Sequence, residues 1–186
     1  EARILASFDH PYIVPVYDCG RTDDGLCYSV SKYIDGSDLA ARLKHTPPSF
    51  AATAELITRI CDALHYAHLR RVIHRDVKPA NIMIDQEDHP WLVDFGIALK
   101  EEDYGRIQPT MGTLPYMSPE QLRGEGHLVD GRTDVFSTGV MLYQMLTGRR
   151  PFPSKRLIQD LSIEPRPPRQ LDDTIPKELE RICLKA

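Results

Sequence analysis

Apolar positions recur at helical spacing in two long stretches of the chain. Between Phe50 and Arg70 the apolar residues fall every three or four positions, which predicts a helix with one buried face. Ser49, preceded by two prolines, marks its start. Residues 134–146 are apolar nearly all round, which predicts a buried helix, and Gly148 is a typical helix stop. The first of these stripes comprises Leu56, Ile57, Ile60, Cys61, Leu64 and Ala67.

Shorter apolar runs bounded by turn-forming residues predict two antiparallel hairpins. Residues 13–17 and 26–30 flank the turn cluster CGRTDDG, and residues 82–84 and 91–93 flank DQEDHP. Residues 4–8 have the spacing of the last turns of a helix, and ELERICLKA near the other end has that of an amphipathic helix.

The second hairpin organises three polar residues, Asp76, Asn81 and Asp94. Because a hairpin brings its outer ends together, Asn81 and Asp94 are expected side by side. Carboxylate and amide oxygens suit Mg²⁺. Asp76, on the loop that enters the hairpin, would lie near them, where an unpaired carboxylate can orient a hydroxyl and accept its proton. The alternative is that all three are ordinary loop residues capping a hairpin.

Composition narrows the class of protein. The 186 residues are 41% hydrophobic and 27% charged, as in ordinary globular domains, and suffice for one core. The net charge is −4 with scattered basic residues, so no nucleic-acid partner is expected. No apolar run approaches the roughly eighteen residues of a membrane span. Four cysteines without C-x-x-C spacing predict unpaired thiols in a reducing compartment, namely Cys19, Cys27, Cys61 and Cys183.

The sequence IHRDVKPANIM followed by DFG resembles the catalytic and metal-binding loops of protein kinases. Lys78, two residues after Asp76, is similar to the serine/threonine class rather than the tyrosine class. Further on, MGTLPYMSPE resembles the end of a kinase activation segment, with Ser118 where alanine is more usual. The resemblance covers essentially the whole chain and is nearest to bacterial eukaryote-like (Hanks-type) kinases.

This resemblance implies a protein-kinase-like α+β fold, with a mostly helical C-lobe and an incomplete β N-lobe. Residues 1–30 match the end of helix C and strands four and five, residues 31–36 the hinge, and residues 37–186 the C-lobe. Within it, residues 73–83 match the catalytic loop and residues 94–120 the activation segment. No G-x-G-x-x-G loop or strand-three lysine precedes Glu1, and the usual arginine partner of Glu120 is not present. A kinase domain cut short at both ends, catalytically silent by itself, is therefore expected.

The resemblance also implies roles for individual residues. Asp76 would be the base for a Ser or Thr hydroxyl, and Lys78 would neutralise charge on the γ-phosphoryl group of ATP. Asn81 and Asp94 would hold Mg²⁺ or Mn²⁺. The nucleotide would be contacted by the gatekeeper Ser31, the hinge from Lys32 to Ile34, Asp38 at the ribose, and Met83 with Ile82 and Ile84 below the adenine. Asp38 has a second interpretation as a carboxylate at a helix start.

Further residues are implied to support or regulate the site. Asp134 would accept hydrogen bonds from the backbone of the His74–Arg75 turn, since a buried carboxylate needs such partners. Arg75 would pair with a phosphate on Thr110, for which an ordinary loop threonine is the alternative. His65 and His68 are read as helix-surface residues rather than metal ligands. Glu1 would be the partner of the missing lysine, or alternatively a solvated terminal residue. Leu5, Val16, His74 and Phe95 would form a regulatory spine. Gly96 is the last residue of DFG, and Thr113 would contact Asp76 and Lys78.

The implied function is ATP-dependent phosphorylation of Ser or Thr in protein substrates during signal transduction. The implied location is the cytoplasm, alone or as the cytoplasmic domain of a longer membrane-anchored kinase, with self-association for autophosphorylation. A pseudokinase scaffold or nucleotide-binding module is the alternative, against which Asp76, Lys78, Asn81 and Asp94 are all intact. Small-molecule phosphotransferases share the H-x-D-x-x-x-x-N loop but not the GT-x-x-Y-x-SPE segment. The protein substrate and the activating signal are not evident from the sequence.

Overall fold

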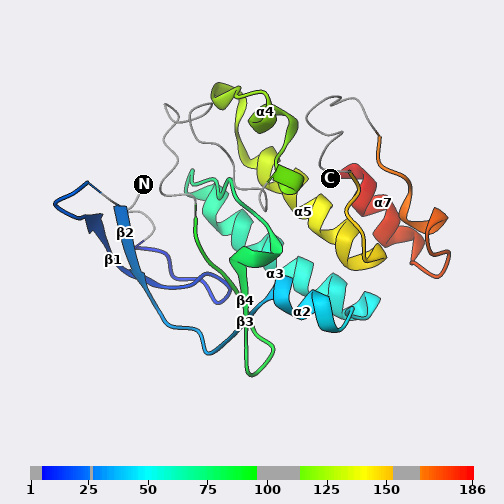
Figure 1. The fold of residues 1–186 in the computed structure, drawn as a ribbon, viewed down its shortest axis with the longest axis horizontal. Helices are drawn as coiled ribbons and strands as arrows, with labels where there is room; N and C mark the ends of the chain where they lie inside the picture. The colour runs from blue at the N-terminus through cyan, green and yellow to red at the C-terminus, as the bar shows by residue number, and fades with distance from the viewer. Residues whose placement is uncertain (1–5, 26, 96–113, 153–163) are drawn as a thin grey trace.

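The computed structural model describes residues 6–25, 27–95, 114–152 and 164–186. A hairpin of two strands stands beside a larger body of helices and a small sheet (Figure 1). These mixed helices and antiparallel sheets confirm the α+β class. The main elements in chain order are β1 (Val16–Arg21), β2 (Cys27–Ser31), β3 (Gly36–Asp38), α2 (Leu39–His45), α3 (Phe50–Leu69), β4 (Ile82–Asp85), β5 (Pro90–Leu92), α4 (Pro119–Leu122), α5 (Gly131–Thr147) and α7 (Lys177–Lys185).

The first hairpin, β1–β2, begins later than its sequence pattern predicts. Residues 13 and 14 bind β5 instead: the N–H of Val14 donates to the carbonyl of Leu92 at 3.0 Å, and Ile13 forms a parallel bridge with the same residue. The strand therefore runs from Val16 through Arg21, and the turn shrinks to residues 22–25. Gly25 closes this turn with a φ of 88°, a value that glycine adopts without strain.

The second hairpin forms as predicted and joins β3 in a three-stranded antiparallel sheet. Ile82 pairs with Leu92, and Met83 pairs with both Trp91 and Asp38. Ile82 and Ile84 are buried, so they face the helical core rather than an adenine site, and the expectation that both pack below the adenine is wrong. Because side chains alternate along a strand, Met83 lies on the other face, half-buried.

The core forms where α3 packs against both α5 and this sheet (Figure 1). Both helices appear where their periodicity predicts them. Ser49 caps α3 by accepting the N–H of Ala52 at 3.2 Å. α5 begins at Gly131, three residues before the predicted start, and ends at Gly148, whose φ is 69°. The most buried side chains include Ile60 and Ala63 of α3, Met141 and Leu142 of α5, and Ile82 and Leu92 of the sheet.

The expectations about a membrane span and about unpaired cysteines can be compared with the described residues. No helix among them combines the length and apolar character needed to cross a bilayer. Cys19, Cys61 and Cys183 are free thiols.

We expect the β1–β2 hairpin to be the least protected part of the described chain. A two-stranded sheet is marginally stable in water, and Tyr17, Tyr28 and Val30 leave 65%, 43% and 47% of their surface exposed. In hydrogen–deuterium exchange, amides of β1 and β2 should exchange at least about tenfold faster than those of β4 and β5. Equal protection of the two hairpins would contradict this.

Candidate active site

The loop between α3 and β4 gathers three side chains around one carboxylate. Oδ2 of Asp76 accepts from Nζ of Lys78 at 2.7 Å and from Nδ2 of Asn81 at 2.9 Å. The same Asn81 nitrogen donates to the main-chain carbonyl of Asp76 at 2.8 Å. Oδ1 of Asp76 is buried and has no hydrogen-bond partner in the described chain. Two donors therefore orient the carboxylate, and its second oxygen is left as an acceptor.

Asp94 lies at the same end of the second hairpin as Asn81. The strand ladder continues beyond β5, because the N–H of Val93 donates to the carbonyl of Asn81 at 3.0 Å. The backbone of Asp94 then turns into the left-handed region with a φ of 55°. This turn leaves Asp94 exposed and buries the next residue, Phe95. The adjacency of Asn81 and Asp94 is what the hairpin pattern predicts.

The loop that carries Asp76 is anchored on the carboxylate of Asp134, which is fully buried at the start of α5. Oδ2 accepts from the N–H of His74 at 2.9 Å, and Oδ1 accepts from the N–H of Arg75 at 2.8 Å. These contacts are the ones expected from the sequence. They hold Arg75 at a φ of 69°, a left-handed conformation that is unfavourable for a residue with a side chain.

A third partner of Asp134 is missed by the sequence interpretation. Nε2 of His68 lies 2.7 Å from Oδ2 of Asp134, so His68 is not an ordinary surface histidine. Its side chain is 25% exposed, whereas His65 faces solvent. The signal was present in the sequence: His68 lies four residues after Leu64, on the buried stripe of α3.

His74 is a buried histidine that links the two halves of the site. Its Nε2 lies 2.9 Å from the carbonyl of Val93, which can only accept, so Nε2 carries the proton. Nδ1 accepts from the N–H of Asp76 at 3.3 Å. Burial lowers the pKa of His74 below its ordinary value, against the opposing effects of Asp134, the Val93 hydrogen bond, Asp76 and Asp94. The ring is therefore neutral at pH 7.

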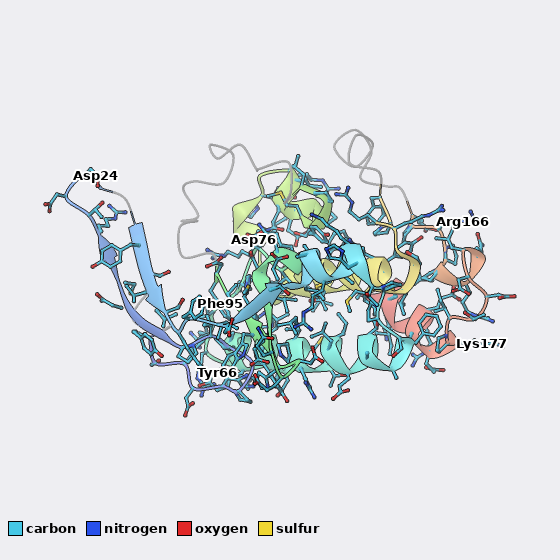
Figure 2. The ribbon with its side chains drawn as sticks, turned by 60° about the horizontal axis from the view of Figure 1, so that its bottom comes forward. Asp24, Tyr66, Asp76, Phe95, Arg166 and Lys177 are labelled. Atoms are coloured by element: carbon cyan, nitrogen blue, oxygen red, sulfur yellow. The ribbon has the colours of Figure 1, made fainter. Side chains whose placement is uncertain are left out.

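Aromatic contacts extend from His74 toward the hairpin. Its ring centroid lies 4.6 Å from that of Phe95, which makes an edge contact with Phe8 at 5.6 Å. Val16 lines a small cavity together with Phe95. Of the residues expected in the regulatory spine, Val16, His74 and Phe95 are thus close in space, while Leu5 lies outside the described residues. Figure 2 labels Asp76 and Phe95 within the body, and Asp24 at the far tip of the hairpin.

The residues expected to face the nucleotide line the junction of the hairpin and the body. Ser31 ends β2 and is exposed, and the N–H of Lys32 donates to the carbonyl of Pro15 at 2.9 Å. The ammonium group of Lys32 lies 4.3 Å from the centroid of the Trp91 ring, and Ile34 is buried. Asp38 accepts from the N–H of Ala41 at 2.7 Å as N-cap of α2, which confirms the helix-start interpretation for this carboxylate.

The Ser-Pro-Glu triplet is fixed by the first turn of α5. Thr133 donates to the carboxylate of Glu120. Burial opposes ionisation of Glu120, but the hydrogen bonds from Thr133 and Ser118 outweigh it, and the net effect lowers its pKa. Gln121, not singled out by the sequence interpretation, donates to the carbonyl of Arg75 at 2.7 Å. Four other expected site residues, Glu1, Gly96, Thr110 and Thr113, lie outside the described residues.

An aspartate oriented by lysine and asparagine, on a loop anchored to a central buried helix, is the arrangement of a protein kinase large lobe. The protein kinase domain family matches residues 1–182, and the chain belongs to that family.

Several curated bacterial proteins are similar to the whole of this chain. It is 40% identical over 200 residues to serine/threonine-protein kinase PknB of Mycobacterium leprae. It is 41% identical over 199 residues to PknB of Mycolicibacterium smegmatis, and 34% identical over 193 residues to serine/threonine-protein kinase PrkC of Bacillus subtilis. The chain spans 31%, 31% and 29% of these relatives, so it corresponds to less than a third of their length.

The lowered pKa of His74 predicts a loss of stability in acid. The unfolded chain binds a proton at this residue near pH 6.5, whereas the folded chain does so only at lower pH. The contribution of His74 is therefore fully present above about pH 6.5 and is lost as pH falls below it, by at most about 1.4 kcal/mol per pH unit.

Substituting His74→Phe removes this proton and should flatten the pH dependence, although the lost Val93 hydrogen bond lowers stability at neutral pH. Urea unfolding between about pH 7.5 and pH 5 measures both effects. His65→Gln, an exposed change on α3, is the control and should keep the parent slope. The prediction is wrong if His74→Phe and the parent lose stability in parallel.

Proposed function

We propose that this chain forms the catalytic core of a protein serine/threonine kinase, which transfers the γ-phosphate of ATP to Ser or Thr hydroxyls. The observation that carries the proposal is the state of Asp76: Oδ2 is held by Lys78 and Asn81, while Oδ1 is buried with no partner in the described chain. The names of the bacterial relatives, all serine/threonine kinases, support the same substrate class.

Asp76 is suited to orient an attacking hydroxyl. A side chain bound by two donors has few accessible rotamers, so Oδ1 has a defined direction. A hydroxyl that donates to this carboxylate would have its oxygen lone pair directed at the phosphoryl group, and its proton could pass to the carboxylate as the bond forms. Lys78 carries a positive charge next to this position, with 17% of its side chain exposed. That charge stabilises the negative oxygens of the moving phosphoryl group.

The donor set beside Asp76 fits a divalent cation. Both hydrogen bonds of the Asn81 amide nitrogen go to Asp76, so the amide oxygen is the end left for a metal. The exposed carboxylate of Asp94 lies at the same end of the hairpin. A carbonyl-type oxygen and a carboxylate are hard ligands suited to Mg²⁺ or Mn²⁺. Such an ion, when bound with ATP, neutralises charge on the phosphates.

Regulation in the complete protein is part of the same proposal. Arg75, whose backbone is held by Asp134, would pair with a phosphate on Thr110, and Thr113 would contact Asp76 and Lys78. Self-association would allow one copy to phosphorylate another. We further propose a role in signal transduction on the cytoplasmic side of the cell.

Asp76→Asn tests the base. In the complete gene product, the change should lower phosphoryl transfer by about 10²-fold or more, because an amide cannot accept the proton. Radiolabelled ATP and a generic Ser/Thr substrate give the rate. Asp173→Asn, an exposed change before α7, should leave the rate unaltered. Activity of Asp76→Asn within a few-fold of the parent would rule out the assigned role.

Asp94→Asn tests the metal site. The change should weaken nucleotide binding in the presence of Mg²⁺ more than in its absence, since the carboxylate contributes through the metal. Calorimetric titration of ATP with and without Mg²⁺ provides the comparison. Asp76→Asn serves as the reference, because Asp76 contacts Lys78 and Asn81 and is not proposed as a metal ligand, so its substitution should affect the two titrations similarly. Equal weakening by Asp94→Asn under both conditions would count against a metal ligand at this position.

A further inference from the structure

Gln121 is a buried side chain that connects two functional segments. Its Nε2 donates to the main-chain carbonyl of Arg75 at 2.7 Å, and its Oε1 accepts from the N–H of Ser118 at 3.0 Å. Only 8% of the residue is exposed. Gln121 belongs to α4 and directly follows residues 94–120, which match a kinase activation segment. Arg75 directly precedes Asp76. One amide therefore joins residues 46 positions apart.

Helix capping explains only one of the two hydrogen bonds of the Gln121 side chain, the one accepted by Oε1. Ser118 and Gln121 have the S-x-x-Q spacing of a capping box, in which the glutamine oxygen accepts the N–H at the helix start. The amide nitrogen has no part in that motif and in a simple cap can remain in water. Here it is turned inward onto the Arg75 carbonyl. This second contact is a tertiary interaction that needs its own explanation.

The contact closes a triangle of hydrogen bonds among three elements. α5 holds the catalytic loop through Asp134 and the N–H of Arg75. α5 also holds α4 through Thr133 and Glu120, and the hydroxyl of Ser137 donates to the carbonyl of Tyr116 at 2.8 Å. The Gln121–Arg75 bond is the third side, between α4 and the loop. Asp134 and Gln121 thus grip the N–H and the C=O of the same residue.

This grip determines the orientation of one peptide plane. The carbonyl of Arg75 and the N–H of Asp76 belong to the same planar unit, so fixing the carbonyl fixes both. The N–H has only a 3.3 Å contact with Nδ1 of His74, which is too long to hold the plane by itself. Rotation of the plane would change φ of Asp76 and redirect its carboxylate. Displacements of about 1 Å at a catalytic group can cost 10²-fold in rate.

We propose that Gln121 is a positioning residue: it sets the orientation of Asp76 through the Arg75 carbonyl and makes that orientation depend on where α4 lies. This inference rests on the proposed kinase function. It assigns the end of the activation segment a direct mechanical link to the base, separate from any contact through a phosphate on that segment.

The test uses Gln121→Met in the complete gene product, since methionine keeps the volume and removes both hydrogen bonds. Gln144→Met is the matched control: Gln144 accepts from the Tyr116 hydroxyl at 2.5 Å, so this change loosens the same segment without touching the loop. Single-turnover phosphoryl transfer should fall about tenfold for Gln121→Met, with KM for ATP within about twofold of the parent. Gln144→Met should stay within about twofold on both measures.

Gln121→Glu adds a readout that a purely structural role would not produce. The ionised carboxylate can accept from Ser118 but cannot donate to Arg75, so transfer should be slow at about pH 8. Burial at this position, which is only 8% exposed, and the facing Arg75 carbonyl favour the neutral form of the new carboxyl group, against the Ser118 N–H, which favours the ionised form. As it protonates toward about pH 6, its O–H regains a donor for Arg75, and the deficit relative to the parent should shrink. The deficit of Gln121→Met should not change with pH.

Hydrogen exchange at the Asp76 amide tests the positioning role of Gln121 independently of kinase activity. Gln121→Met should accelerate that exchange at least about fivefold, and Gln144→Met should not. An inactive parent combined with this acceleration refutes the kinase function and leaves the positioning role standing. Unchanged exchange, equal rate losses for the two methionine variants, or a pH-independent deficit for Gln121→Glu overturns the inference. If Gln121→Met does not fold, the pH response of Gln121→Glu decides the question.

Discussion

The buried carboxylate of Asp134 is the interaction on which the site depends. A carboxylate buried away from water needs hydrogen-bond donors from the protein. The donors to Asp134 come from outside α5: they are the N–H groups of His74 and Arg75 and the ring of His68. Because those donors belong to the loop that carries Asp76 and to the preceding helix α3, the one carboxylate positions both. The left-handed backbone of Arg75 persists because this network holds it in place.

Protonation states in the site follow from burial and hydrogen bonding. His74 is neutral, with its proton on Nε2 facing Val93, so it adds no positive charge next to Asp76. The cation nearest to Asp76 is therefore Lys78, which pairs directly with its carboxylate. Positive charge is therefore absent from the His74 side of Asp76 and is supplied by Lys78, next to the position proposed for the phosphoryl group.

The site joins parts that differ in how extensively they are packed. The loop that carries Asp76 and the second hairpin are tied to the helical body by the core that α3 and α5 share. The β1–β2 hairpin, which carries Ser31 at its end, is a two-stranded unit with exposed aromatic residues. Residues 12–14 form the link between them, since they bind β5 on one side and lead into β1 on the other.

Local pattern in the sequence determined most of the elements and part of the site. The helical stripes and the hairpin between Asn81 and Asp94 are short-range signals that the structure reproduces. The contacts of Asp134 with His74 and Arg75 span 60 and 59 positions, and they were expected from the resemblance to protein kinases rather than from local pattern. The start of β1, the contact of His68 with Asp134, and the contact of Gln121 with Arg75 were decided only by tertiary structure. The last two join residues 66 and 46 positions apart. Periodicity says which face of an element is buried, but it does not say which distant donor or acceptor that face will meet.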